Sequence, residues 1–549
     1  MKTKAKKKEV QKKINKSRKV IIVKRILLVL FSIICATLIV AGNYYSKNFA
    51  GLELDEILFY IQSGLQGTSN SVISTIINQC YKSAILIALI FFILLCTDVK
   101  RKIVMYISWK DLRKKIQLYP IKIIHNHKIL PMICILLASI IFFLKSFGVF
   151  TYLASKMQDT KIFDEYYVAG DSIEIRFPEN KRNLILIFAE SMENSIFSKE
   201  NGGTWNYSIA PELENLALEN INFSHNDKIG GAQNNIGSTF TAAGLISQTA
   251  GIPLLIPSLY NNTDTNIYVG DGNYMENVYT LGDVLKDNGY NLEMMMGSDG
   301  NFGGRTQYFT SNGDYKIFDV NYAVKNGYMK EEDKVWWGFD DEDLFRWSKD
   351  EIINLAKEDK PFNYIMLTAD THFTDGYLSE NAPQDYPTQY ENVHAYSSKC
   401  INEFIEWVKS QDFYEDTTIV VLGDHLGMQT AFYEDRIDDN SYKRTIYNVF
   451  INSAVETENS KNRQFTELDI YPTILASLGA DIEGNRIGLG TNLFSNEPTL
   501  SEKLGVKYLD TEFRKKSHFY NKYIIGDNYY VMKNDAEEQA EKKKENEQN

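Results

Sequence analysis

Hydrophobic residues form two kinds of stretch along this chain. In the first third, three long apolar stretches lie at about 26–41, 83–96 and 129–144, each extendable at its ends. A helix that crosses a bilayer needs about 20 residues, so these stretches predict about three transmembrane helices. After residue 183 the apolar runs are much shorter and alternate with polar or helix-like stretches.

The short runs predict buried strands, because continuous branched and apolar residues suit a strand that is covered on both faces. Candidate helices occur among them, at about 341–357 and 393–409. Alternation of strands and helices predicts an α/β layered domain with a mostly parallel central sheet. The candidate strands are 184–189, 292–296, 364–367, 418–422 and 447–451.

Two of these runs are followed by residues of types that can ligate a metal ion. Glu190 follows the first run, and Asp424 and His425 follow the run at 418–422. Ligands of parallel sheets bind beyond the carboxyl ends of the strands, so these side chains are expected to converge there. Two carboxylates and an imidazole suit a divalent metal. The alternative is that they are merely the polar ends of ordinary strands.

A stretch of small residues at 238–253 supplies a candidate nucleophile. It is expected to open a helix at Thr241 and to close it near Gly251. A hydroxyl at this place is ordinarily a helix N-cap. Beside a metal, however, its pKa falls and it becomes a nucleophile, while the helix terminus favours a bound phosphate. Ser238 and Thr239 lie close by as alternative hydroxyls.

Charge is distributed unevenly and predicts the membrane topology. The chain has 549 residues and a net charge of −12, yet residues 1–28 hold twelve Lys or Arg. Residues 100–128 hold nine more against one acid, whereas residues 43–81 hold one Lys and three acids. The positive-inside rule therefore predicts a cytoplasmic N-terminus and places everything after about residue 150 outside. A cleaved signal peptide is the competing interpretation of the first stretch.

Charge and cysteine content restrict the possible partners and the cellular location of the protein. A basic loop between two membrane spans is a poor candidate for nucleic-acid binding, so we predict no nucleic-acid partner. Of the five cysteines, only Cys400 lies beyond residue 150, so that part cannot form a disulfide within itself. This favours a bacterial cell membrane over an animal secretory pathway.

The expected organisation has six parts, and the last is almost wholly charged or polar. They are a basic leader (1–25), a membrane region (26–148), a connector (149–182), an extracytoplasmic catalytic domain (183–500), its C-terminal extension (501–533) and a disordered tail (534–549).

Five motifs occur in order along the chain. They are Phe-Ala-Glu190-Ser, Thr241-Ala-Ala-Gly-Leu-Ile-Ser-Gln-Thr-Ala-Gly-Ile-Pro, Trp337-Gly-Phe-Asp-Asp-Glu-Asp-Leu-Phe, Leu367-Thr-Ala-Asp-Thr-His372-Phe-Thr-Asp-Gly and Gly-Asp424-His425-Leu-Gly-Met. Together they resemble the alkaline phosphatase/sulfatase superfamily, and within it the membrane-anchored phosphoglycerol transferases and, more distantly, the lipoteichoic acid synthases. One more string, at 54–68, resembles the first external loop of those transferases, so the resemblance spans about residues 50–495.

The resemblance implies a role for each of these residues. Thr241 would be the nucleophile, His372 an acid/base or leaving-group contact, and Arg305 a cation that grips phosphate. One divalent metal is implied, most simply Mn²⁺, with Mg²⁺ or Zn²⁺ as alternatives. The implied metal ligands are Glu190, Thr241, Asp424 and His425.

The implied reaction moves glycerophosphate from phosphatidylglycerol to a cell-surface glycan or teichoic-type polymer through a phospho-threonine intermediate. A lipoteichoic acid synthase or a phosphoethanolamine transferase would use the same site. A membrane-tethered binding or sensory protein on an inactive fold is the non-enzymatic alternative. Sulfatases carry a convertible cysteine at the nucleophile position, so Thr241 argues against sulfatase activity.

Overall fold

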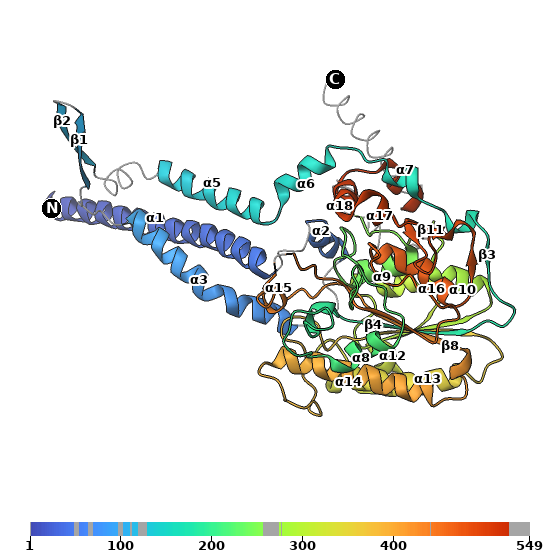
Figure 1. The fold of residues 1–549 in the computed structure, drawn as a ribbon. Helices are drawn as coiled ribbons and strands as arrows, with labels where there is room; N and C mark the ends of the chain where they lie inside the picture. Colours follow the sequence, from blue (N-terminus) through green and yellow to red (C-terminus); the bar gives the residue numbers. More distant parts are fainter. Residues whose placement is uncertain are drawn as a thin grey trace, which may run out of the picture. The chain divides into compact units, whose positions relative to one another are not determined.

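The computed structural model describes residues 2–48, 54–63, 70–96, 103–109, 112–118, 129–255, 274–275, 277–439 and 441–525. The chain divides into two compact units, one of residues 1–50 and 70–150 and the other of residues 51–69 and 151–549 (Figure 1). The tail predicted to be disordered, 534–549, lies outside the described residues.

The first unit contains helices α1 (Lys2–Asn48), α3 (Asn70–Cys96) and α5 (Ile129–Ser146). Among the described residues, three stretches of these helices are long and apolar enough to cross a membrane: Lys19–Asn48, Ile76–Cys96 and Ile129–Ser146. Many of their leucines and isoleucines are exposed, as in helices that face lipid. The chain is therefore membrane-anchored, and the second stretch begins earlier than its sequence suggested.

The basic segment between the second and third spans includes two described strands. It contains an antiparallel hairpin of β1 (Ile103–Trp109) and β2 (Leu112–Leu118).

The second unit is built on a six-stranded sheet with strand order β6-β5-β7-β4-β8-β9. The first five strands in this order run parallel, and β9 pairs antiparallel with β8. All five predicted strands are present. The bounds are β4 (Asn183–Ala189), β5 (Asn291–Met296), β6 (Lys316–Phe318), β7 (Phe362–Leu367), β8 (Thr417–Gly423) and β9 (Asn448–Ile451).

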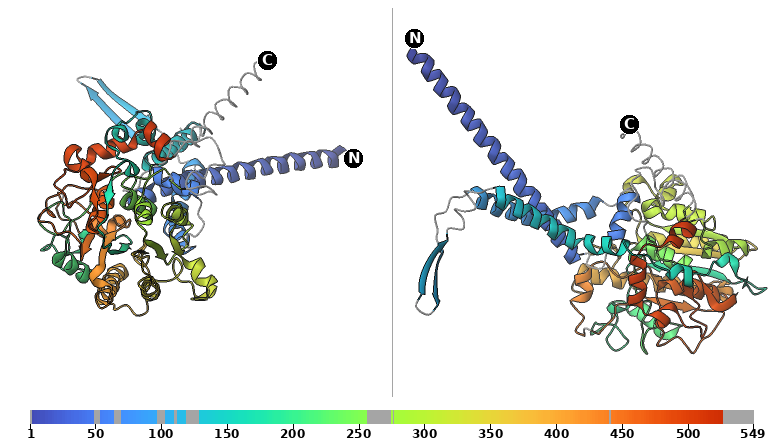
Figure 2. Two further views of the ribbon diagram at one scale, coloured as in Figure 1. Left: turned by 90° about the vertical axis from the view of Figure 1, so that its right-hand side faces the viewer. Right: turned by 90° about the horizontal axis from the view of Figure 1, so that it is seen from above.

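Side chains alternate between two cores along β4. Leu186 and Phe188 belong to the core on one face of the sheet, and Ile185 and Ile187 belong to the core on the other. Helices cover both faces, as Figures 1 and 2 show. On the first face lie α9 (Thr241–Ala250), α10 (Leu281–Asp287), α11 (Arg305–Ser311), α16 (Ile470–Ser477), α17 (Leu500–Leu504) and α18 (Val506–Arg514).

The second face carries the longer helices, α13 and α14, which correspond to the two helices expected from the sequence. A parallel sheet covered on both faces by helices confirms the predicted α/β fold class. The helices of this face are α8 (Pro211–Glu219), α12 (Val320–Lys325), α13 (Asp341–Leu355), α14 (Gln389–Lys409) and α15 (Thr430–Glu434).

The segment predicted as a connector, 149–182, contains α6 (Val149–Lys156), α7 (Ile162–Tyr166) and β3 (Ile175–Arg176). Its strand pairs with β10 (Asp481–Ile482), and the buried Phe163 ring lies 5.1 Å from the Tyr520 ring. The second half of this segment is thus part of the catalytic fold. A further hairpin joins β11 (Arg486–Ile487) to β12 (Gly490–Thr491).

Candidate active site

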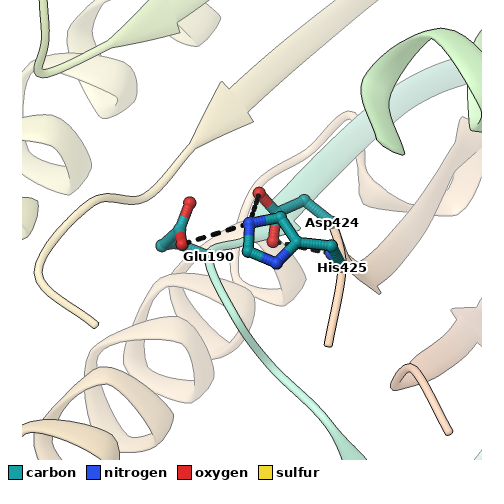
Figure 3. A group of neighbouring side chains, drawn as sticks. All are labelled: Glu190, Asp424 and His425. Carbon is teal, nitrogen blue, oxygen red and sulfur yellow. Dashed lines mark hydrogen bonds and ion pairs between the residues drawn. The ribbon is translucent and has the colours of Figure 1, made fainter. Parts of the chain in front are cut away.

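Three side chains converge at the carboxyl ends of two neighbouring parallel strands (Figure 3). Glu190 follows β4, and Asp424 and His425 follow the neighbouring β8. His425 Nε2 lies 3.4 Å from Glu190 Oε1 and 3.4 Å from Asp424 Oδ2. The three side chains each offer a ligand atom within 4.8 Å of the others, and all are buried. Parallel neighbours bring their ends together, as the sequence predicted.

Hydrogen bonds fix the orientation of these ligands. The backbone N–H groups of Ser191 and His425 both donate to Asp424 Oδ1, at 2.8 and 2.9 Å. Within the described part of the chain, the buried Asp424 Oδ2 accepts no hydrogen bond. His425 Nδ1 lies 2.8 Å from the Leu426 carbonyl, so this nitrogen carries a proton and the ring is held with Nε2 turned toward the two carboxylates.

The three ionisable groups perturb one another strongly. Burial, together with the charge of Glu190, raises the pKa of Asp424 well above its usual range. Burial would also raise the pKa of Glu190, but His425 outweighs it and lowers that pKa. Against the effect of burial, the two carboxylates raise the pKa of His425 to about 10. Two buried carboxylates thus demand a positive partner, which is either a proton or a metal ion.

Thr241 is the first residue of α9 and faces this cluster. Its Oγ1 lies 3.2 Å from Glu190 Oε2 and 3.4 Å from His425 Nε2. The N-cap position belongs to Phe240, whose side chain makes no capping hydrogen bond. The alternative that Thr241 serves as the N-cap is therefore wrong. Ser238 Oγ instead donates to the Asn235 carbonyl at 2.8 Å, inside a turn.

Helix α9 packs closely against the end of β8 through Gly244 and Gln248. A Cβ on Gly244 would lie only 2.0 Å from the Asp424 carbonyl oxygen, so only glycine permits this approach. Gln248 Nε2 donates to the Gly423 and Asp424 carbonyls, each at 3.1 Å. Gly251 adopts the left-handed conformation, with φ of 65°, and ends the helix where the sequence predicted.

His372 follows β7 and lines the same pocket as Glu190 and Thr241. Its Nδ1 lies 2.7 Å from the Phe373 carbonyl and therefore carries the proton. Burial, despite the nearby charge of Glu190, lowers the pKa of His372. The ring is thus neutral near pH 7 and leaves Nε2 as a proton acceptor.

Arg305 lines this pocket too and is only 6% exposed. Its Nε donates to the Phe302 carbonyl at 2.9 Å and its Nη2 to the Asp299 carbonyl at 2.8 Å. The guanidinium therefore also stabilises the loop at 299–304, which precedes it. The structure brings all six predicted site residues to one place.

One further residue of the site, Trp337, was not predicted to line it. The Trp337 ring lies 4.8 Å from the His372 ring and 5.4 Å from the Phe302 ring, forming an aromatic wall of the pocket. Trp337 opens one of the motifs quoted above, which was the only signal that could have identified it.

Two buried acids outside the pocket hold the loops that carry site residues. Asp341 accepts the backbone N–H groups of Ala369, at 2.7 Å, and Asp370, at 3.2 Å, and so fixes the loop that carries His372. Glu193 accepts the Gly427 N–H at 2.9 Å and pairs with Arg444, which fixes the loop after His425. Sequence patterns cannot pair residues so far apart.

Comparisons with known proteins agree with this geometry. Residues 182–480 match the family described as Sulfatase. Over 343 residues the chain is 30% identical to phosphoglycerol transferase I of Salmonella choleraesuis, a match that covers 60% of this chain and 41% of that relative. The chain thus spans less than half the length of the relatives that it matches.

Two solved structures are similar as well. The lipoteichoic acid synthase LtaP of Listeria monocytogenes shows a TM-score of 0.45 and 20% identity, over 61% of this chain and 81% of that one. The lipooligosaccharide phosphoethanolamine transferase A of Neisseria meningitidis shows a TM-score of 0.45 and 14% identity, over 83% and 84%.

The family match covers more than half of the chain and includes all six predicted site residues. It confirms the resemblance inferred from the motifs. This chain belongs to the sulfatase family.

Proposed function

We propose that the protein is a metal-dependent phosphoglycerol transferase, which moves glycerophosphate from phosphatidylglycerol to a cell-surface glycan or teichoic-type polymer. The observation that carries the proposal is the position of Thr241 Oγ1, 3.2 Å from Glu190 and 3.4 Å from His425 at the start of a helix. The similarity to phosphoglycerol transferase I supports the choice of donor.

The residues present fit a divalent metal. Asp424 Oδ2 is buried without a hydrogen bond inside the described residues, beside a second buried carboxylate and an imidazole nitrogen. Oxygen and imidazole ligands suit Mn²⁺, which we propose, and also Mg²⁺ or Zn²⁺. The ion would be held by Glu190, Thr241, Asp424 and His425. When bound, it supplies positive charge that lowers the pKa of the hydroxyl and stabilises the phosphoryl oxygens.

Transfer would proceed in two steps. Thr241 Oγ forms a bond to the donor phosphorus, the bond from phosphorus to the diacylglycerol oxygen breaks, and the hydroxyl proton passes to that oxygen. An acceptor hydroxyl then attacks the glycerophospho-threonine and releases Thr241. The neutral His372 would take the acceptor's proton and return it to Thr241.

The surrounding residues give the pocket positive charge and hydrogen-bond donors suited to a phosphate group. The uncapped start of α9 presents backbone N–H groups to a phosphate, and Arg305 adds a positive charge at the pocket wall. Burial of the site strengthens these interactions, because little water screens them.

We further propose that the protein is a multi-pass protein of a bacterial cell membrane with a cytoplasmic N-terminus. The charges at 1–28 and 100–128 support this orientation through the positive-inside rule. Residues 183–500 would then form an extracytoplasmic catalytic domain, extended by 501–533. A lipid donor explains why the catalytic domain is tied to a membrane.

Product analysis tests the function. The full-length protein, in phosphatidylglycerol vesicles with Mn²⁺ and an oligosaccharide acceptor, is expected to release diacylglycerol and add single glycerophosphate groups to the acceptor. Chains of glycerophosphate would instead indicate a polymerase, and turnover of phosphatidylethanolamine alone would indicate a phosphoethanolamine transferase. Absence of lipid cleavage under all these conditions would contradict the proposal.

A further inference from the structure

Helix α2 (Leu54–Ser63) belongs to the catalytic unit although it is distant from that unit in sequence. It lies in the segment between α1 and α3, both of which belong to the other unit. It lies beside elements of the catalytic unit (Figure 1). The chain thus leaves the first membrane helix, contributes a helix to the catalytic unit, and then enters the second membrane helix.

Phe59 joins α2 to the residue that precedes the nucleophile. It is 0% exposed and belongs to the core that covers one face of the sheet. Its ring centroid lies 5.2 Å from that of Phe240, the N-cap residue of α9. This packing helps to hold the backbone from which Thr241, the next residue, projects.

The same ring also lies beside the loop that carries Arg305. Helix α2 contacts the turn Phe302–Gly304, which ends immediately before Arg305. A Cβ on Gly303 would lie 3.9 Å from Phe59 Cε1 and 3.3 Å from Ala242 Cβ. Gly303 and Ala242 both line the pocket of Thr241 and Arg305. Phe59 therefore lies beside both segments, the one that supplies the proposed nucleophile and the one that supplies the proposed cation.

We infer that Phe59 is a positioning residue of the active site, and that α2, from the segment between the first two membrane helices, completes the catalytic pocket. It sets the separation of Thr241 and Arg305 by packing against Phe240 and the turn at Gly303. This inference rests on the proposed function, because it assigns Thr241 as the reacting group.

Kinetics of the full-length protein in phosphatidylglycerol vesicles test the positioning role. Since misplacement of a reacting group by about 1 Å costs about a hundredfold, Phe59→Ala is expected to lower kcat about tenfold to a hundredfold, with KM changed less than about threefold. Phe59→Leu should recover much of this loss. The matched control is Ile57→Ala, on the same helix but in neither core cluster, which should leave kcat unchanged.

Metal content separates positioning from simple unfolding. Phe59 is not one of the proposed metal ligands, so Phe59→Ala should still bind Mn²⁺ like the wild type. A double variant with Phe240→Ala should be no slower than the slower single variant, because both changes break one contact. Loss of metal together with activity, or additive effects of the two changes, would overturn the inference.

A photocrosslink tests the placement of α2 without any activity. Phe59→p-benzoylphenylalanine in the full-length membrane protein should crosslink to the tryptic peptide 229–286, which contains Phe240, or to 287–305, which contains Gly303. Absence of both crosslinks would overturn the inference. If the crosslink forms but the wild type cleaves no lipid, the proposed function fails while the position of α2 stands.

Discussion

At the scale of single residues, three of the proposed metal ligands, Glu190, Asp424 and His425, lie at strand ends and not within the hydrophobic cores. Glu190→Gln and Asp424→Asn keep the shape of each side chain but remove its charge. We expect each to lower Mn²⁺ affinity at least tenfold and to abolish lipid cleavage, because neutral amides are weak metal ligands. The melting temperature should change little.

The control for this pair is Glu200→Gln, an exposed acid in the loop after β4. It should bind metal and turn over lipid like the wild type. Metal analysis that finds full occupancy in both ligand variants would contradict the assignment.

Glu467 gives a prediction about stability and pH. The residue is fully buried, and burial raises its pKa to about 8. The unfolded chain loses this proton near pH ~4.3, so between about pH 4.3 and 8 the folded state binds more protons. The free energy of unfolding therefore falls as pH rises through that window.

Glu467→Gln should remove this dependence, since the amide can still accept the 2.9 Å hydrogen bond from Asn234. We expect the variant to match the wild type at pH 4 and to exceed it by a few kcal/mol at pH 8.5, at about 1.4 kcal/mol per pKa unit. Denaturant unfolding at the two pH values measures the difference. A constant difference at both would contradict the raised pKa.

At the scale of elements, the fit of α9 against β8 depends on Gly244. Gly244→Ala would place a Cβ 2.0 Å from the Asp424 carbonyl oxygen, so the helix must shift and carry Thr241 with it. We expect at least a tenfold loss of kcat and a lower melting temperature. Gln248→Ala removes two hydrogen bonds without adding an atom, so it should lower kcat and the melting temperature less than Gly244→Ala does. Wild-type kinetics in Gly244→Ala would contradict this packing.

The strands that carry Glu190 and Asp424 could be predicted from the sequence because their apolar residues are continuous. Glu190 and Asp424 end continuous apolar runs, and such runs are the signature of strands that are buried on both faces. The start of α9 and its end at Gly251 were also predictable from local chemistry.

Other features were beyond the sequence because they depend on long-range packing. The three-residue strand β6 is too short to show a pattern. Nothing local indicates that Phe59 packs against Phe240 or that Glu193 pairs with Arg444. Each contact joins segments that only the folded chain brings together.

At the scale of the whole molecule, the proposed topology places the catalytic unit outside the cell. Met157 is 87% exposed and follows α6, so a protease added to intact cells should cut near residues 155–159 and release a soluble fragment. N-terminal sequencing of the fragment locates the cut. Protection of residues 151–525 until the membrane is broken would contradict the orientation.

The central claim is that Thr241 carries the glycerophosphate between donor and acceptor. The most direct measurement is mass analysis of the full-length protein after incubation with phosphatidylglycerol and Mn²⁺ but no acceptor. We predict that the tryptic peptide 229–286 gains the mass of glycerophosphate on Thr241, and that Thr241→Ala neither gains it nor releases diacylglycerol. Lipid cleavage by Thr241→Ala at the wild-type rate, or the added mass on Ser238 or Thr239, would contradict the account.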